Sequence, residues 1–170
     1  MFIMQQLSVL NPEALSSEAM ASLKLRQAAR AIVLDDDHRV ALLHVSKKGF
    51  YKLPGGGVEN DEDFLTALKR ECREEIGSSI EVIRELGMIV EYRGKFGVRQ
   101  ESYCYIARLI GEKGQPNFTL HEKEDGFTVL WVPLDEALRL IAEAQPQDYL
   151  GNFVQPRDLT FLQEAARVLV

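Results

Sequence analysis

A run of three glycines, Gly55 to Gly57, followed at once by a helix-like pattern, constrains the fold of this chain more than any other feature of its sequence. Consecutive residues without Cβ atoms do not suit the interior of a helix or strand, so the run predicts a loop whose backbone can approach another group closely. The segment beyond it repeats apolar residues at helical spacing: Leu65, Leu68, Cys72 and Ile76. Asn60 or Asp61 is expected to cap this helix, and Gly77 to end it.

Most of the remaining chain is predicted to alternate strands with helices. Apolar, β-prone segments predict strands over residues 28–34, 40–45, 80–92, 102–110 and 128–132, and helical patterns cover 134–144 and 158–169. Asn11 followed by Pro12 is typical of a helix start and predicts a helix through Leu25. Residues 111–126 are polar and contain Gly and Pro, which indicates a long loop. We therefore expect an N-terminal helical extension, residues 1–25, followed by a single domain at 26–170.

The composition argues against several classes of protein. The chain has 170 residues, of which 46% are hydrophobic, and no apolar run reaches the ~18 to 20 residues that cross a bilayer. Twenty Lys and Arg against 26 Asp and Glu give a net charge of −6, which argues against binding long nucleic acid through its phosphates. The only cysteines, Cys72 and Cys104, lack metal-ligand spacing and fit a reducing compartment. We expect a cytoplasmic protein that binds neither membranes nor long nucleic acid.

Three carboxylates crowd one flank of the predicted helix. Glu71, Glu74 and Glu75 share about 100° of its surface, close to the apolar stripe, where like charges repel and ionisation is costly. Arg70 can pair with Glu74 one turn on, but it cannot neutralise three acids, whereas a hard divalent cation can. The pattern therefore indicates Mg²⁺, with Mn²⁺ as a substitute. Carboxylates, a divalent ion and a glycine cradle together suit displacement at phosphorus, which predicts phosphoanhydride hydrolysis.

Residues 56–78 resemble the Nudix box, the pattern G-x5-E-x7-R-E-U-x-E-E-x-G-U in which U is a bulky apolar residue. The specified positions are in register: Gly56, Glu62, Arg70, Glu71, Glu74, Glu75 and Gly77. Ser78 departs from the last apolar position, which concerns only packing at the helix exit. Taken alone, an acidic helix face is usually just solvated and a glycine run just a turn, but the complete register favours a functional site.

The resemblance implies a fold, a reaction and a set of site residues. The fold is an α/β/α sandwich with a mixed β-sheet over residues 26–170, and the reaction is Mg²⁺-dependent hydrolysis of a nucleoside diphosphate linked to another moiety. By position, the residues that would hold the metal are the Gly56 carbonyl, Glu71, Glu74 and Glu75, one of these acids also serving as base. Glu62 and Arg70 would support them. A further acid is expected from the loop before the Trp131 strand: Glu122 first, then Glu124, with Asp125 as the third candidate.

The expected substrate is a small nucleotide, with a nucleoside triphosphate, including oxidised forms such as 8-oxo-dGTP, as the leading candidate. The residues that we expect to contact it are Gly55, Gly57, Tyr51, by stacking on a base, and Arg99, by meeting a phosphate, as Arg93 and Lys95 also could. Core packing for Tyr51 and solvated charges for the three cations are the alternatives. ADP-ribose or another nucleotide sugar as substrate, a non-hydrolytic nucleotide-binding module, a prenyl diphosphate isomerase and a homodimer also stay open.

Overall fold

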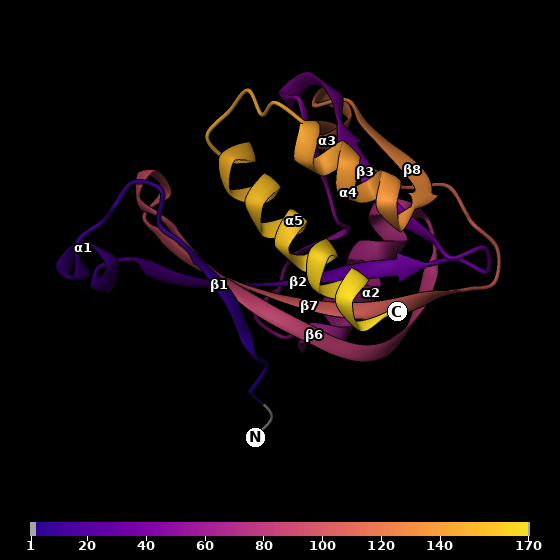
Figure 1. Ribbon diagram of the computed structural model, residues 1–170, viewed down its shortest axis with the longest axis horizontal. Coiled ribbons are helices and arrows are strands. Elements are labelled where there is room, and N and C mark those ends of the chain that lie inside the picture. Colours follow the sequence, from indigo (N-terminus) through magenta and orange to yellow (C-terminus); the bar gives the residue numbers. More distant parts are fainter. Residues whose placement is uncertain (1–2, 170) are drawn as a thin grey trace.

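The computed structural model describes residues 3–169, which form one mixed eight-stranded sheet with helices on both faces (Figure 1). The strands are β1 (Gln6–Leu10), β2 (Lys24–Leu34), β3 (Arg39–Val45), β4 (Phe50–Lys52), β5 (Gly55–Gly57), β6 (Ser79–Arg93), β7 (Val98–Ile110) and β8 (Phe127–Pro133). The helices are α1 (Ser17–Ala21), α2 (Phe64–Ile76), α3 (Leu120–Glu124), α4 (Leu134–Glu143) and α5 (Gly151–Val168), with short 3-10 turns at Ser46–Lys48 and Gly94–Phe96. The expected architecture of a mixed sheet between helices is confirmed.

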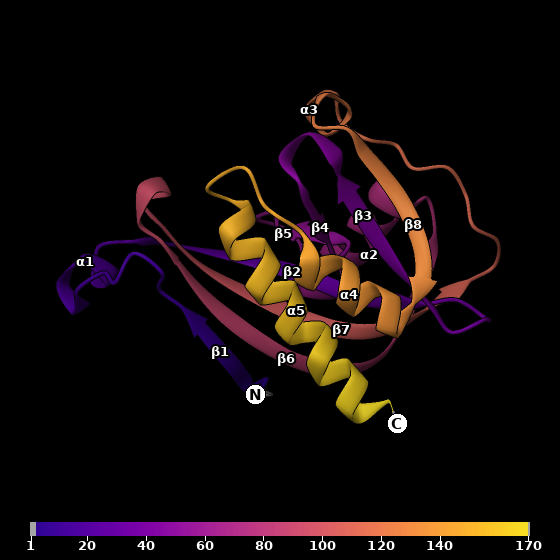
Figure 2. The same cartoon turned by 45° about the horizontal axis from the view of Figure 1, so that its top comes forward.

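The sheet order is β1-β6-β7-β2-β3-β4, with β5 paired to β2 and β8 paired to β3. β2 runs parallel to β7, whereas β6 and β7 form an antiparallel hairpin. β2 and β3 pair only next to their turn, where Leu34 lies opposite Val40, and the two strands then separate. Figure 2 shows β4 and β5 between β2 and β3 where they diverge. This opening in the sheet is where the candidate site lies.

Alternation along β2 gives the sheet two apolar faces. Ala31 faces α2, where it belongs to the same buried cluster as Leu68. Its neighbour Ile32 faces the other way and packs with Ile141 of α4 and Phe161 of α5. Because successive residues of a strand point to opposite faces, one strand serves as the centre of both layers. Helix α2 therefore covers one face of the sheet, and α4 and α5 cover the other (Figure 1).

The glycine run forms a short strand, so the prediction of a loop is wrong. β5 pairs antiparallel with β2, with Gly56 opposite Ala29. Gly55 has a φ of 138°, and a Cβ there would lie 2.1 Å from the Ala29 carbonyl oxygen. Only glycine allows this close approach. The glycine run is therefore needed for pairing with β2 as well as for close contact with the neighbouring helix.

Helix α2 has the predicted end but a different start. Its N-cap is Asp63, whose side chain accepts a 2.7 Å hydrogen bond from the Thr66 N–H, and not Asn60 or Asp61. Gly77 ends the helix in the left-handed conformation, with a φ of 63°. The acidic flank and the apolar stripe thus lie on one continuous helix, as the spacing predicted.

Replacing Gly77 by Ala is expected to lower the free energy of unfolding by about 2 kcal/mol or more, because the left-handed conformation disfavours a Cβ. A Cβ at Gly77 would also lie 2.4 Å from the backbone carbon of Gln115. Gly97 is a matched control, since it has a φ of 64° and no atom within 4 Å of its added Cβ. Urea unfolding of both variants measures the two costs. Equal losses for Gly77→Ala and Gly97→Ala would show that the contact with Gln115 adds nothing.

The N-terminal segment differs from the predicted helical extension. β1 pairs in parallel with β6, and Lys24 already belongs to β2. The Asn11 side chain accepts a 2.9 Å hydrogen bond from the Leu15 N–H, and this local loop replaces a helix start. Helix α1 covers only five residues and is capped by Ser16. The prediction of a helix through residue 25 is therefore wrong, while the domain division at that residue stays a prediction.

Two further differences shape the site. Helix α5 begins at Gly151, well before the predicted residue 158, and its first turns accommodate Pro156. The predicted loop at 111–126 contains α3, capped by Thr119 and Glu122. Both changes bring additional side chains to the opening between β2 and β3. Within residues 3–169, no helix combines the length and apolar character needed to cross a membrane.

Candidate active site

A cavity of about 520 Å³ lies between β5, the C-terminal half of α2, the α3 segment and the first turns of α5. Several residues that the sequence predicted for the site line it: Gly55, Gly56, Gly57, Glu71, Glu75 and Glu122. The fold therefore brings the glycine strand, the acidic helix and the α3 segment to one place. Each of these elements comes from a different part of the chain.

Arg70 contacts the two more exposed acids of α2, Glu71 and Glu74, and also Glu62, which precedes the helix. Its Nε and Nη2 donate to Glu62 at 2.7 and 2.9 Å, and Nη1 lies 3.0 Å from Glu71 and 3.5 Å from Glu74. The guanidinium lowers the pKa of Glu62 to about 2, mainly through these hydrogen bonds. The predicted Arg70–Glu74 pair is confirmed, although Glu62 is the closer partner. Arg70 thus makes charge-assisted contacts with Glu62, Glu71 and Glu74 at once.

Glu75 is the buried acid of the group. Its two oxygens accept hydrogen bonds from the Gly55 N–H at 2.8 Å and the Lys52 ammonium at 2.9 Å. Burial raises the pKa of Glu75 above its usual range, against the opposing effect of Lys52. Lys52 also donates to the Gly55 carbonyl at 3.3 Å, so a cation stands between a carboxylate and a backbone oxygen. Sequence reasoning missed Lys52. Residues two apart in a strand point to the same face of a sheet, so the position of Phe50 could have indicated where the Lys52 side chain points.

Glu71 and Glu74 lie on the more accessible side of α2. A Cβ on Gly56 would lie 2.5 Å from a carboxylate oxygen of Glu71, so only glycine leaves room for that carboxylate. The pKa of Glu74 is raised by partial burial and then by Glu71, with Glu122 adding to the effect. Glu122 is therefore near enough to interact with the acids of α2. It also accepts a 2.8 Å hydrogen bond from the Thr119 N–H, which caps α3.

The oxygen donors of this site fit a hard divalent cation. Among residues 3–169, no three acidic, His or Cys side chains converge closely enough to hold a metal ion. Glu71 pairs with Arg70 at 3.0 Å, whereas Glu75 pairs with Lys52 at 2.9 Å, so these acids contact different cations. Carboxylate and carbonyl oxygens are the ligands that Mg²⁺ prefers, and the Gly56 cradle allows a carboxylate to approach the glycine strand. The Gly55 carbonyl already accepts hydrogen bonds from Arg30 at 2.7 Å and from Lys52 at 3.3 Å, so the Gly56 carbonyl stays the predicted backbone donor.

Six residues predicted for the site do not line the cavity: Glu62, Arg70, Glu74, Glu124, Tyr51 and Arg99. Glu74 still shares Arg70 with Glu71, whereas Glu124 is exposed on α3. Strand alternation turns Tyr51 away, and its ring stacks on His44 with 4.4 Å between ring centroids. Arg99 pairs with Glu101 at 3.0 Å. The roles of these residues remain predictions, and for the last three the arrangement does not favour them.

The cavity also contains cationic residues that the sequence pattern did not single out. Arg26 and Arg30 of β2, Arg93 of β6 and Arg157 of α5 all line it, and of these only Arg93 was considered as a phosphate contact. A charged residue inside the apolar run of β2 was a usable signal for Arg30. Arg157 could not be found in this way, because its place depends on how α5 packs.

Comparison with known proteins assigns the family. The NUDIX domain model matches residues 24–153. The chain is 28% identical over 142 residues to an RNA pyrophosphohydrolase of Pelagibacter ubique (strain HTCC1062), covering 75% of this chain and 88% of that protein. It is 27% identical over 127 residues to an RNA pyrophosphohydrolase of Halorhodospira halophila (strain DSM 244 / SL1), covering 63% and 68%.

Solved structures agree with this assignment at the level of the fold. A NUDIX hydrolase from Nitrosomonas europaea has a TM-score of 0.62 at 16% identity, covering 85% of this chain and 90% of that chain. A MutT protein from Methanosarcina mazei Go1 has a TM-score of 0.61 at 16% identity, covering 85% and 95%. Nudix hydrolases use divalent metal ions, in keeping with the oxygen donors described above. Because the family model spans most of the chain, this protein belongs to the Nudix family and is a Nudix-type pyrophosphohydrolase.

Proposed function

We propose that this pyrophosphohydrolase cleaves a phosphoanhydride bond of a nucleoside triphosphate and that it uses Mg²⁺. The observation that carries the proposal is one cavity that is lined both by acids of α2 and α3 and by cationic side chains of β2, β4 and α5. Acids suit a divalent cation and arginines suit phosphate oxygens, so the cavity matches a metal–polyphosphate substrate. Two relatives named RNA pyrophosphohydrolase support hydrolysis of a pyrophosphate bond.

The roles of the side chains follow from their surroundings. Glu71, Glu74 and Glu75, with a carbonyl of the glycine strand, would hold Mg²⁺, and Arg70 would keep the outer carboxylates oriented. When bound, Mg²⁺ neutralises phosphate oxygens and lowers the pKa of a water nucleophile. The residue that we propose as the further acid is Glu122, which would accept a proton from the attacking water across the cavity.

A substrate panel tests this function. We expect the purified protein to release phosphate or pyrophosphate from ATP, GTP, dGTP, 8-oxo-dGTP or a 5′-triphosphorylated RNA oligonucleotide in Mg²⁺, to be inactive in EDTA and to recover in Mn²⁺. ADP-ribose is the comparison substrate. Turnover of ADP-ribose without turnover of any triphosphate would overturn the proposed substrate class. Tight nucleotide binding with no hydrolysis in either metal would instead indicate a non-hydrolytic binding module.

A further inference from the structure

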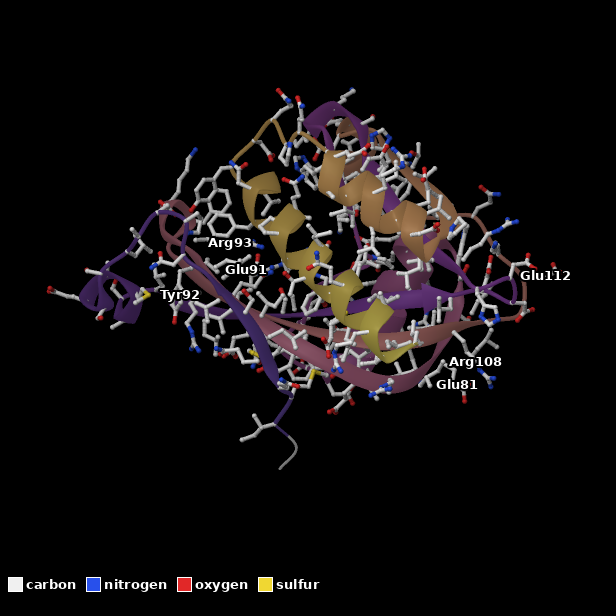
Figure 3. The ribbon with its side chains drawn as sticks, viewed as in Figure 1. Glu81, Glu91, Tyr92, Arg93, Arg108 and Glu112 are labelled. Atoms are coloured by element: carbon white, nitrogen blue, oxygen red, sulfur yellow. The ribbon has the colours of Figure 1, made fainter. Side chains whose placement is uncertain are left out.

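Four arginines from three elements, which we call the arginine cluster, line the cavity together: Arg26, Arg30, Arg93 and Arg157. Arg26 and Arg30 share one face of β2, Arg93 ends β6, and Arg157 lies on the second turn of α5. Figure 3 shows Arg93 and Glu91 beside the first turns of α5, whereas Tyr92 lies on the other side of the strand. Strand alternation and the early start of α5 thus direct the four guanidiniums to one region.

Two buried carboxylates neutralise only part of this charge. Arg157 donates to Asp158 from Nε at 2.7 Å and from Nη2 at 3.2 Å, and Arg93 donates to Glu91 at 2.6 Å. The ion pairs within residues 3–169 include none between a carboxylate and either Arg26 or Arg30. Arg30 instead donates to the Gly55 carbonyl at 2.7 Å, and Arg26 to the side-chain oxygen of Gln100. Two positive charges in the cluster therefore have no direct anionic partner in the described part of the chain.

Some donors in the cluster are also unused. Arg157 is fully buried, yet its Nη1 finds no hydrogen-bond acceptor among the described residues and lies 3.5 Å from Glu91. The Nε of buried Arg30 is unused in the same way. Burial and the nearby Arg157 charge lower the pKa of Arg30 to about 10, so it remains a cation at neutral pH. Buried donors and charges without partners are costly, which indicates that a ligand completes this region.

The cluster adjoins the glycine strand, which would help to hold Mg²⁺ in the proposed function. Arg30 contacts the Gly55 carbonyl, and a Cβ on Gly57 would lie 2.7 Å from Nη2 of Arg26. A phosphate chain that begins at the acids of α2 would thus continue over Arg30 and Arg26. Guanidinium groups match phosphate oxygens with two parallel hydrogen bonds, which suits them to this ligand more than to a neutral base or sugar.

We propose that the arginine cluster is a binding site for a substrate phosphate additional to the two phosphates joined by the cleaved bond. This inference rests on the proposed function and assigns the residues that would restrict it to substrates with three or more phosphates. A nucleoside diphosphate linked to a neutral sugar would leave the cluster without its ligand. The enzyme therefore selects its substrate by phosphate number.

Binding of inorganic tripolyphosphate in EDTA tests the site without metal or turnover. We expect isothermal titration calorimetry to show one tripolyphosphate per chain, bound more tightly than orthophosphate. Arg26→Gln is expected to weaken it about 10- to 100-fold, the range for losing a charge-assisted contact. Arg26 is an exposed residue, so the change does not open the core. Arg139→Gln, at an exposed arginine of α4 that does not line the cavity, is the matched control and should bind like wild type.

Kinetics provide a second readout. Arg26→Gln should raise KM for the triphosphate about 10- to 100-fold with little change in kcat, and Arg26→Lys should fall between Arg26→Gln and wild type. KM for a nucleotide sugar such as ADP-ribose should not change. Wild-type tripolyphosphate affinity in Arg26→Gln, or equal affinities for orthophosphate and tripolyphosphate, would overturn the proposal. Metal-free tripolyphosphate binding that needs Arg26, in a protein that hydrolyses no nucleotide, would support the site and refute the proposed function separately.

Discussion

Replacing Glu74 by Gln is expected to lower kcat for the best triphosphate substrate by at least about 10³-fold, or ~4 kcal/mol of transition-state stabilisation. The amide keeps the size of the side chain but removes an anionic oxygen donor from the set proposed to hold Mg²⁺. Glu74 is the suitable acid for this test because its side chain is 41% exposed and its nearest cation, Arg70, keeps closer contacts with Glu62 and Glu71. Glu75→Gln would be less informative, since it would also leave Lys52 without its buried partner.

The same substitution should not reduce stability. Partial burial and Glu71 raise the pKa of Glu74, so its ionised form is less favourable in the folded protein than in the unfolded chain. Removing that charge is therefore expected to leave Tm in EDTA unchanged or higher. Glu124→Gln serves as the control, because Glu124 is exposed and does not line the cavity. Near-normal turnover by Glu74→Gln, or an equal loss in Glu124→Gln, would contradict the assignment of the metal-binding acids.

Replacing Glu91 by Gln is expected to lower the free energy of unfolding by about 3 to 5 kcal/mol, the usual cost of breaking a buried ion pair. Glu91 is fully buried and accepts hydrogen bonds from Arg93 at 2.6 Å, Ser102 at 2.7 Å and Gln100 at 3.1 Å. Without its charge, Arg93 loses its buried partner and Arg157 keeps only Asp158. Urea unfolding at neutral pH measures the loss. The conservative control is Glu81→Gln, because the Glu81 side chain is 51% exposed where it pairs with Arg108.

The same carboxylate should make the fold sensitive to acid. Burial raises the pKa of Glu91, but Arg157, Arg93 and the Ser102 hydroxyl more than offset this and lower it to about 2. A lowered carboxyl pKa stabilises the fold above the unfolded value of about 4.3, and this stabilisation is lost as the pH falls toward 2. We expect the Tm of the wild type to fall steeply between about pH 4.5 and pH 2. The Tm of Glu91→Gln should fall less steeply over the same range. Parallel curves for the two proteins would show that Glu91 does not carry this pH dependence.

Local patterns were sufficient for the acidic helix and its immediate neighbours. Glycine spacing, the apolar stripe and the position of Gly77 act within one or two helical turns, so the register from Gly56 to Gly77 could be predicted without a structure. The pairing of Arg70 with Glu74 followed from the same geometry. The sheet between helices followed from the family resemblance, and the structure bears it out.

The sequence by itself thus determined the family, the α2 helix and the acids on its flank, because each depends on residues close together in the chain. The tertiary structure decided the rest of the site. Glu75 meets Lys52 and Gly55, and Arg157 reaches the cavity, only because β4, β5 and α5 pack around the opening between β2 and β3. Such contacts join residues far apart in the chain, and their formation depends on the free energy of the whole packed core, which no local spacing records.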